Sequence, residues 1–410
     1  MKGLFYKRHA DKSIRKLSKM FGAVLVTGAR QAGKTTLLLD TAGQIGYVTL
    51  DDKIQLMNAV NQSGTFFKDN PPPVFVDEVQ YAPNLFPEIK IILDKEKKKG
   101  LFYLSGSQQF EMMKNVSESL AGRLGILNLP GLSLRELYGL AFHEPFLPTD
   151  EYFKNRASEK AYISYNDAWK IIHRGSFPGL CANVDFDWGM FYAAYVKTYI
   201  ERDVRDLAQL GDEVKFMRFM TVAASRTSQL LNISSLARDV AISQPTAERW
   251  LSILTTSNLV FLLQPYYNNI TKRTVKTPKL YFLDTGLAAY LTRWNMPDVL
   301  KNGAMAGAFF ETFIICEIIK SYYNNGILDL PLYYYRDRDG NEIDLLIENS
   351  GTLYPVEIKK HADPVISDVQ KFSILDKIPA VKRGQGGVIC FYDNLATIHG
   401  NDKSIPINML

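Results

Sequence analysis

A nine-residue segment, residues 28–36, carries the residue types that binding of a nucleoside triphosphate requires. It follows the pattern G-x-x-x-x-G-K-[ST], whose glycines let backbone N–H groups close around a phosphate. We expect Lys34 to reach the β- and γ-phosphates and Thr35 to ligate Mg²⁺. The alternative is a glycine-rich turn that matches by chance. The residues of this phosphate loop are Gly28, Ala29, Arg30, Gln31, Ala32, Gly33, Lys34, Thr35 and Thr36.

The elements around the segment are those that such a loop needs. An apolar, β-branched run at residues 21–27 predicts a buried strand, and residues 36–40 open a helix. The amino end of that helix adds a partial positive charge toward a bound phosphate. Strand, loop and helix together therefore favour a nucleotide site over a chance match.

Two carboxylates follow a second predicted strand. Residues 71–73 are prolines that break the chain, and residues 74–76 are apolar before Asp77 and Glu78. A phosphoryl-transfer site needs one carboxylate for Mg²⁺ and one group that orients the attacking water. We assign Asp77 to the metal and Glu78 to the water, as general base. The alternative is an ordinary strand end with solvated acids.

Two further polar features follow in the chain. The predicted strand at residues 100–104 ends in Ser105 and Ser107, either of which could sense the γ-phosphate. A strand followed by a Ser-Gly turn is also common. Arg123 precedes an apolar run and could stabilise transition-state charge, in its own site or in a neighbour's. The alternative is a surface arginine.

A second group of chemistry-bearing residues lies near the end of the chain. Asp344, Glu357 and Lys359 follow the pattern D-x₁₂-E-x-K on two adjacent predicted strands, and Glu357 and Lys359 share a face because they are two residues apart. Asp344 and Glu357 could share a Mg²⁺ while Lys359 steadies a phosphate or a water. Glu311, on a predicted helix at residues 307–322, could add a fourth polar group. The set resembles the PD-(D/E)xK nuclease core; the alternative is an antiparallel sheet with incidental charges.

Residues 216–283 predict a winged helix. Two short helices at residues 233–240 and 244–255 precede strands at 259–263 and 279–283. Such modules place the second helix in the major groove of DNA. The alternatives are a protein contact or a lid over the nucleotide site. The residues that would face DNA are Gln244, Thr246, Arg249, Lys272, Arg273 and Lys276.

Composition narrows the class of protein. The 410 residues predict two or three domains, and 46% hydrophobic with 22% charged residues fits a globular chain. The net charge of +5 does not by itself imply nucleic acid. The three cysteines are far apart, so we expect a reducing compartment and no zinc site. We also expect no membrane helix and no signal peptide, and hence a cytoplasmic protein.

Over nearly its full length the chain resembles AAA+-like ATPases of bacteria and archaea whose C-terminal half is a domain of unknown function. The resemblance implies ATP and Mg²⁺ as ligands and allows a homo-oligomer. We identify no second sensor arginine, which leaves the lid and the oligomeric state open. Besides the loop and the acids above, it is carried by Val79-Gln80, Leu120-Ala121-Gly122, residues 175–178, residues 199–204, residues 284–287, Arg336 and residues 342–343.

The expected fold is α/β, in three parts. Residues 1–135 form a P-loop NTPase parallel sheet, residues 136–290 a helical domain with the winged helix, and residues 291–410 a restriction-endonuclease-like α/β domain. The leading hypothesis is a Mg²⁺-dependent ATPase that couples nucleotide state to a winged-helix and nuclease-like module acting on DNA. One alternative is a nucleotide switch or scaffold with an inactive nuclease-like domain. The other is an ATP-regulated DNA nuclease.

Overall fold

The computed structural model describes residues 6–106, 120–159, 161–199, 213–266, 277–337, 339–378 and 381–410. The predictions for Ser107, Lys272, Arg273 and Lys276 therefore lie outside the described residues. Among the described residues, no helix combines the length and the apolar character needed to cross a membrane.

The N-terminal part is a parallel sheet of five strands in the order β2-β3-β4-β1-β5, covered by helices on both faces. The central strand β1 is buried at every position, as a parallel strand between two helical layers must be. Helices α1 and α2 pack on one face, and α4 and α5 on the other. The strands are β1 (Ala23–Thr27), β2 (Gly46–Thr49), β3 (Val74–Asp77), β4 (Phe102–Gly106) and β5 (Leu124–Asn128). The helices are α1 (Ala10–Met20), α2 (Lys34–Ala42), α3 (Lys53–Asn61), α4 (Ser63–Asp69), η1 (Val79–Tyr81) and α5 (Leu85–Glu96).

A helical region follows β5 and leads into a small antiparallel sheet. This sheet has the order β6-β8-β7 and lies beside the helices α13, α14 and α15. The helices are α7 (Leu134–Leu137), α8 (Asp150–Arg156), α9 (Tyr165–Arg174), α10 (Pro178–Ala182), α11 (Trp188–Tyr199), α13 (Glu213–Ala224), α14 (Ile233–Val240) and α15 (Gln244–Thr256). The strands are β6 (Gln229–Leu230), β7 (Val260–Leu263) and β8 (Lys279–Phe282).

The C-terminal part is a mixed sheet in the order β14-β15-β13-β11-β10-β9, with β12 paired to β11. Its helices are α17 (Thr285–Leu291), α18 (Pro297–Asn302), α19 (Ala306–Tyr323), α20 (Ile366–Gln370), η3 (Lys371–Lys377) and η4 (Ile407–Met409). Its strands are β9 (Leu332–Arg336), β10 (Glu342–Asn349), β11 (Thr352–Ile358), β12 (Lys382–Arg383), β13 (Gly387–Cys390), β14 (Ala396–His399) and β15 (Asp402–Pro406).

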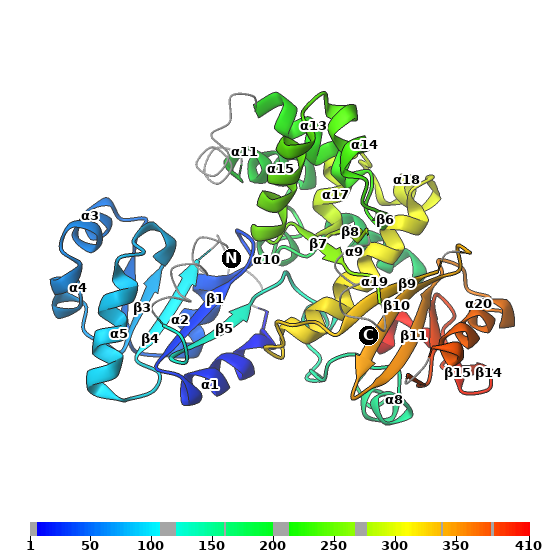
Figure 1. Cartoon of the computed structure of the whole chain (residues 1–410), viewed down its shortest axis with the longest axis horizontal. Helices are drawn as coiled ribbons and strands as arrows, with labels where there is room; N and C mark the ends of the chain where they lie inside the picture. The colour runs from blue at the N-terminus through cyan, green and yellow to red at the C-terminus, as the bar shows by residue number, and fades with distance from the viewer. Residues whose placement is uncertain are drawn as a thin grey trace.

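Helix α19 is the centre of packing in the second half of the chain. Every residue from Thr312 to Tyr322 is buried, so the helix is enclosed on all sides. One continuous apolar core runs from Leu134 to Leu410 and includes the helical region, the small sheet and the C-terminal sheet. Figure 1 shows α19 in yellow between the blue N-terminal sheet and the orange C-terminal sheet. The predicted α/β class is confirmed, and the second half packs as one body around α19.

Candidate functional site

The phosphate loop lies between β1 and α2 and depends on its two glycines. Gly28 has φ 144°, and a Cβ there would lie 2.3 Å from the carbonyl oxygen of Leu129. Gly33 has φ 90° and immediately precedes Lys34, the first residue of α2. Both conformations favour glycine because a side chain would be strained or would clash. The loop therefore directs its backbone toward the amino end of α2, where an anion is favoured.

Lys34 crosses the loop with its side chain. Its ammonium donates to the carbonyl oxygen of Gly28 at 3.0 Å and to that of Ala29 at 2.9 Å. The residue is buried, and it faces the same cavity as Thr35 and Thr36. The loop thus holds a cation at the place where the motif predicts contact with phosphates.

Asp77, at the end of β3, accepts hydrogen bonds from three neighbouring elements. The Thr35 hydroxyl donates to Asp77 Oδ2 at 2.9 Å, and the Tyr47 hydroxyl donates to the same oxygen at 3.4 Å. Ser105, on the intervening strand β4, donates to Asp77 Oδ1. A carboxylate beside a hydroxyl is a donor set that suits Mg²⁺. The residues present at this site therefore fit the metal that the motif implies.

Glu78 follows Asp77 in a left-handed conformation, with φ 58° and ψ 43°. Its carboxylate accepts a hydrogen bond from the side-chain amide of Gln80, and its backbone N–H donates to Ser105 Oγ at 3.3 Å. Glu78 also lines the cavity beside Lys34. Sequence reasoning gave Gln80 no role, although it belongs to the Asp-Glu-Val-Gln motif that carried the resemblance.

The cavity over the loop has a volume of about 580 Å³ and is closed in part by the helical region. Pro178 and Gly179 of α10 line it, as do Tyr195 and Thr198 of α11. Sequence reasoning recognised residues 175–178 as a motif but gave them no place. The structure puts α10 directly over the loop: Pro178 Cγ lies 3.7 Å from the position of a Cβ on Gly33.

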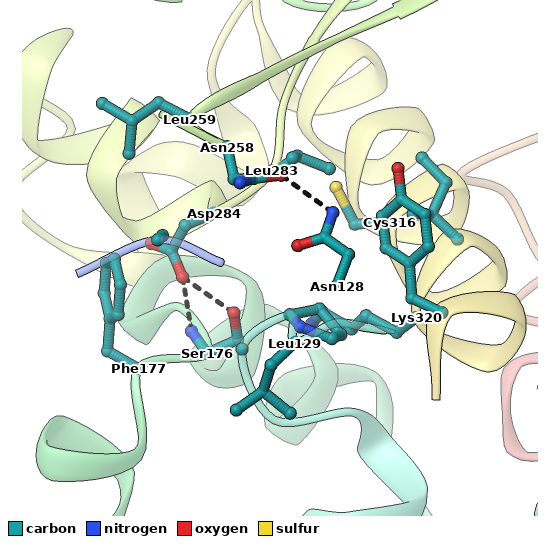
Figure 2. Close-up of a pocket in the computed structure, with 15 residues that line it drawn as sticks. Asn128, Leu129, Ser176, Phe177, Asn258, Leu259, Leu283, Asp284, Cys316 and Lys320 are labelled. Atoms are coloured by element: carbon teal, nitrogen blue, oxygen red, sulfur yellow. Dashed lines mark hydrogen bonds between the residues drawn. The ribbon is translucent and has the colours of Figure 1, made fainter. Parts of the chain in front are cut away.

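Asp284 holds the segment before α10 in position. Its carboxylate accepts from the N–H and hydroxyl of Ser176 at 2.7 and 2.9 Å, from the Tyr192 hydroxyl at 2.7 Å and from the N–H of Leu287 at 2.7 Å. Figure 2 shows Asp284 directed at Ser176. Gly175 is required beside this cluster, because a Cβ there would lie 2.2 Å from the Tyr192 hydroxyl. The motifs at residues 175–178 and 284–287 thus bind each other.

Arg8 ties the phosphate loop to the segment after β5. Its guanidinium donates to the carbonyl oxygen of Ala32 at 2.8 Å and of Pro130 at 2.7 Å, and it pairs with Glu136 at 3.0 Å. Burial alone would raise the pKa of Glu136, but Arg8 and His9 outweigh it and hold that pKa below its usual range. This buried ion pair fixes the loop from the side opposite Asp77.

Arg123 lies at the wrong edge of the sheet to act in its own site. It precedes β5, and β5 runs parallel to β1 with Ala23 beside Leu124 and Thr27 beside Asn128. The phosphate loop follows the carboxyl end of β1, whereas Arg123 sits at the amino end and pairs with Asp94 at 2.5 Å. The assignment of Arg123 to its own nucleotide is therefore wrong. A role in a neighbouring subunit's site stays a prediction.

The structure places the C-terminal carboxylates on adjacent strands. Leu345 of β10 pairs with Val356 of β11, so Asp344 and Glu357 are the next opposite pair and share a face. Glu311 reaches the same cluster from α19. Lys359 pairs with Glu357 Oε1 at 2.5 Å, and Lys371 of η3 pairs with the same oxygen at 2.6 Å.

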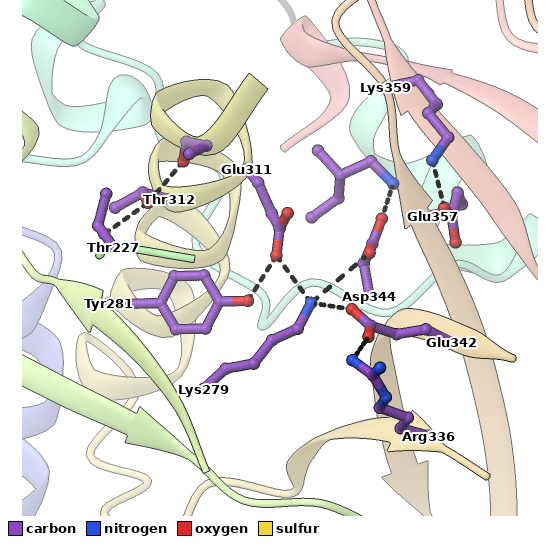
Figure 3. A network of polar contacts seen from close by, with 12 residues as sticks. Thr227, Lys279, Tyr281, Glu311, Thr312, Arg336, Glu342, Asp344, Glu357 and Lys359 are labelled. Atoms are coloured by element: carbon purple, nitrogen blue, oxygen red, sulfur yellow. Dashed lines mark hydrogen bonds and ion pairs between the residues drawn. The ribbon is translucent and has the colours of Figure 1, made fainter. Parts of the chain in front are cut away.

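Lys279 of β8 lies in the middle of this cluster and was missed by sequence reasoning. Its ammonium lies 3.2 Å from Glu311, 2.6 Å from Glu342 and 3.8 Å from Asp344, as Figure 3 shows. Burial lowers the pKa of Lys279, but the three carboxylates outweigh that effect and raise it above its usual range. The lysine is therefore charged, and it pairs with Asp344, one of the two carboxylates that were expected to share Mg²⁺.

The donor set at this second site does not fit a divalent ion. Asp344 Oδ2 accepts from the N–H of Ile358 at 2.9 Å, and Glu342 is shared with Arg336 at 3.1 Å. Burial, followed by the neighbouring Asp344, raises the pKa of Glu357 to about 7. Within the described part of the chain, no group of three or more His, Cys, Asp or Glu side chains is arranged to hold a metal.

The face of α15 that was expected to meet DNA carries both signs of charge. Gln244 and Arg249 are exposed, but the Gln244 amide donates to the exposed carboxylate of Glu248 at 3.0 Å. Thr246 belongs to the cap of the helix, because its N–H and hydroxyl contact the Ser243 hydroxyl. The described part of this surface is therefore only weakly basic.

Comparison with protein-family models divides the chain into three segments. Residues 21–138 match a model described as "AAA domain". Residues 165–298 and 306–410 match two models described as domains of unknown function, DUF8612 and DUF4143. Together with the five-stranded parallel sheet and the loop geometry, the first match supports a P-loop fold for the N-terminal part.

Individual relatives and solved structures share less than a third of their residues with this chain. An uncharacterized protein of Mycobacterium tuberculosis, Rv2008c, and one of Mycobacterium bovis, Mb2031c, are each 29% identical over 388 residues, which is 91% of this chain and 78% of the relative. A Walker-type ATPase of Pyrococcus abyssi is 14% identical, with a TM-score of 0.41, over 70% of this chain and 96% of that one. A signal transduction ATPase with numerous domains from Pyrococcus horikoshii is 10% identical, with a TM-score of 0.26, over 80% and 49%.

Proposed function

We propose that this protein binds ATP with Mg²⁺ at residues 28–36 and hydrolyses it. The observation that carries the proposal is the convergence of Lys34, Thr35 and Glu78 on one cavity of about 580 Å³, with Asp77 bound to Thr35. A loop cation, a carboxylate with a hydroxyl and a second carboxylate are the parts that phosphoryl transfer to water needs. The match of this part of the chain to an AAA domain supports the same conclusion.

Each residue has a separate task in this reaction. Lys34 would exchange its two carbonyl contacts for the β- and γ-phosphates. Thr35 and Asp77 would hold Mg²⁺, which when bound neutralises charge on the phosphate oxygens. Glu78 would orient a water and accept its proton, which requires its carboxylate to turn toward the cavity from Gln80. Ser105 keeps Asp77 in place through the hydroxyl contact.

A second cavity beside the loop suits the base of the nucleotide. It has a volume of about 210 Å³ and adjoins Gly33 and Thr36, which also line the larger cavity. Its apolar walls come from Leu37, Leu132 and Pro178, with Tyr6 and Arg8 at its polar side. A flat base needs such apolar walls with a few polar groups at the edge. We assign it to adenine.

We further propose that the nucleotide acts as a switch on the helical region. Residues of α10 and α11 line the nucleotide cavity, and Asp284 connects α10 to the end of β8. The order α13-β6-α14-α15-β7-β8, with its antiparallel sheet, supports a winged helix whose position would respond to ATP. The partner that we propose for it is DNA, and the mixed charge on α15 keeps a protein partner as the alternative.

Of the two readings of the C-terminal part, the observations favour a non-cleaving domain over a nuclease. Cleavage would need a metal on Asp344 and Glu357, and both carboxylates already pair with lysines, Asp344 with Lys279 and Glu357 with Lys359 and Lys371. Incubation of plasmid with protein, Mg²⁺ or Mn²⁺ and ATP tests this directly. Cleavage that is lost in Asp344→Ala would establish the nuclease and remove this part of the proposal.

The proposed nucleotide site is tested by binding. Calorimetry with Mg²⁺ and ATP should show one site on the wild type and none on Lys34→Ala, because a charge aimed at the phosphates is lost. Lys95→Ala, which removes an exposed lysine of α5, is the matched control and should bind as the wild type does. Unchanged affinity in a folded Lys34→Ala variant would refute the assignment.

A further inference from the structure

The edge of the N-terminal sheet at which its strands begin carries a basic surface that the nucleotide site does not use. We propose that this surface binds the phosphate backbone of duplex DNA without reading its sequence. It is separate from the DNA contact proposed for α15, and it does not require nucleotide. We call it the lysine surface, and it consists of five exposed lysines at the ends of α1 and α5: Lys16, Lys19, Lys95, Lys97 and Lys99.

The positive charge of the chain is concentrated in the part that holds the lysine surface. Residues 1–138 contain 19 Lys and Arg against 13 Asp and Glu, whereas residues 139–410 contain 29 against 30. The excess of positive charge therefore lies in the N-terminal part, and the remainder of the chain is close to neutral. A polyanion that approaches the protein is attracted to the N-terminal part, because unlike charges steer the encounter.

The topology of the sheet brings these lysines together. In a parallel sheet, the helix that precedes a strand ends at the edge where that strand begins. Helix α1 ends before β1, α5 ends before β4, and these two strands are neighbours. The N–H of Gly100 donates to the carbonyl oxygen of Phe21 at 2.9 Å, so the segment after α5 contacts the end of α1.

The lysine surface lies at the opposite edge of the sheet from the nucleotide. The phosphate loop follows the carboxyl end of β1, whereas α1 leads into its amino end. The five residues of β1 place about 15 Å between the two edges. A macromolecule on the lysine surface would therefore leave the nucleotide cavity open.

The acidic residues beside the lysine surface are already paired with other cations. Glu96 pairs with Lys98 at 3.3 Å, and Asp94 pairs with Arg123 at 2.5 Å. In the described part of the chain, no carboxylate oxygen lies within 4.0 Å of the ammonium group of any of the five lysines. The charge of the surface is therefore not neutralised from within the described chain, and phosphates would neutralise it.

Stabilisation of the two helix ends explains only part of this pattern. The carboxyl end of a helix favours a cation in its last turn, which accounts for Lys19 and Lys95. This effect fades within one turn, so it does not account for Lys16 or for Lys99, which lies three residues beyond the end of α5. The positive charge extends further than the helix ends require.

The side chains at this edge favour a duplex over other polyanions. Proteins hold single strands by stacking bases on aromatic rings, and residues 15–20 and 94–99 contain no aromatic side chain. Attachment to a membrane needs an apolar anchor besides basic residues. Helices α1 and α5 expose one large apolar side chain each, Met20 and Ile91, which is too little for such an anchor. A duplex offers closely spaced phosphates, which lysines contact without further groups.

Fluorescence anisotropy of a labelled duplex of about 30 base pairs tests the proposal on the full chain without nucleotide, between ~50 and ~200 mM salt. The wild type should bind duplexes of different sequence equally, with an affinity that falls as salt rises. Replacing Lys16, Lys19, Lys97 and Lys99 by alanine should reduce the salt slope by about 3 to 4 units, because each phosphate contact contributes about 0.9. Affinity at the lowest salt should fall by ~10²-fold or more.

The matched control removes the same charge from the second half of the chain. Alanine at Lys154, Lys170, Lys360 and Lys382, all exposed lysines, should leave the wild-type salt slope unchanged. An equal loss in this control would show a response to net charge alone and would overturn the proposal. So would a wild type that does not bind the duplex at low salt, or a lysine-surface variant with the wild-type slope.

Two further measurements separate this proposal from its neighbours. Sedimentation with phosphatidylcholine vesicles that contain phosphatidylserine should show no binding, and vesicle binding in place of duplex binding would replace DNA by a membrane. Calorimetry with ATP should give the same affinity for the lysine-surface variant and the wild type. If neither protein bound ATP, the proposed nucleotide site would fail, whereas the duplex measurement would still decide the role of the lysine surface.

Discussion

Asp77 is the residue on which the nucleotide site depends, because it joins three strands at their carboxyl ends. It is the last residue of β3, it accepts from Ser105 on β4, and it accepts from Thr35 of α2, the helix that follows β1. These strands are neighbours in the order β3-β4-β1, so the contacts cross the middle of the sheet. The pairing of Asp77 with Thr35 also leaves the carboxylate where a metal on the loop would need it.

Loss of the Asp77 charge should abolish the effect of Mg²⁺ on nucleotide binding. In the wild type we expect Mg²⁺ to tighten ATP binding, because it neutralises the phosphates. Asp77→Asn keeps the shape and some hydrogen bonds but removes the negative charge that holds the ion. Calorimetry with ATP in Mg²⁺ and in EDTA measures the difference. An equal gain from Mg²⁺ in both proteins would assign the metal to another residue.

The sequence alone allowed us to predict the carboxylates of both sites, because these residues lie in local motifs. Asp77 and Glu78 end a recognisable strand, and Asp344 and Glu357 are 13 residues apart on a hairpin. The place of Lys279 in the C-terminal cluster could not be predicted from the sequence. Lys279 comes from a strand 32 residues before Glu311, and the pairing of that strand depends on the whole fold. The own-site role was one option for Arg123 because the motif alone does not give the direction of the strand that follows it.

At the scale of the elements, the contact between Asp284 and Ser176 holds α10 over the phosphate loop, and we call this contact the clamp. The helix α10 is short, and its position depends on the cap of α17, Asp284, which accepts from Ser176. The contacts between residues 175–178 and 284–287 hold Pro178 over Gly33. The two motifs are more than a hundred residues apart, so their spacing in the sequence did not predict that they meet.

Weakening this clamp should lower nucleotide affinity at a distance from the loop. Asp284→Asn removes charge from four hydrogen bonds, each of which contributes about 1 kcal/mol or more when the acceptor is charged. We expect weaker ATP binding than in the wild type and a lower unfolding midpoint. Asp298→Asn, which changes an exposed aspartate of α18, is the control. If Asp284→Asn loses stability but binds ATP normally, the clamp has no role in the nucleotide site.

The elements α14, α15, β7 and β8 carry the proposed DNA contact. Replacing Arg249, Lys272, Arg273 and Lys276 by alanine should weaken binding of duplex DNA and flatten its salt dependence. Each phosphate contact that is lost should remove about one unit from the slope. Fluorescence anisotropy at several salt concentrations measures both quantities. A wild type that does not bind DNA at low salt would favour a protein partner.

At the scale of the whole molecule, β8 connects the two sites. It begins at Lys279, within the C-terminal carboxylates, and two residues after its end Asp284 holds the segment that covers the phosphate loop. A direct contact between Asn128 at the end of β5 and Asn258 before β7, at 2.8 Å, joins the N-terminal sheet to the small sheet. The strand β8 and the segment after it therefore contact both the C-terminal cluster and the segment over the phosphate loop.

The bounds of several helices and strands followed from local patterns, whereas the way these elements pack did not. The strands and helices expected at residues 233–263 and 307–359 appear within a few residues of their predicted bounds. The sequence contains no local sign that α19 is enclosed by both the helical region and the C-terminal sheet. That enclosure results from long-range contacts of apolar residues such as Phe310, Phe313 and Ile318. The sequence shows that these residues are apolar, but it does not show which elements they pack against.

Two histidines, the half-buried His9 and the buried His173, should make the folded protein sensitive to mild acid. Burial lowers the pKa of His9 and of His173 below the usual value of about 6.5. Below that pH the unfolded chain takes up protons that the native state does not, so the free energy of unfolding falls as pH falls. Urea unfolding at pH 7.5 and 5.5 measures the change. His173→Gln should reduce it, and the exposed His399→Gln should not.

Steady-state ATP turnover by the wild type and by Glu78→Gln tests the central claim most directly. The account predicts that the wild type hydrolyses ATP in the presence of Mg²⁺. It also predicts that Glu78→Gln binds ATP with similar affinity but turns it over more slowly by ~10²-fold or more, since it lacks the general base. Turnover by Glu78→Gln within a few-fold of the wild type would contradict the assignment of Glu78, and a wild type without turnover would contradict the proposed ATPase activity itself.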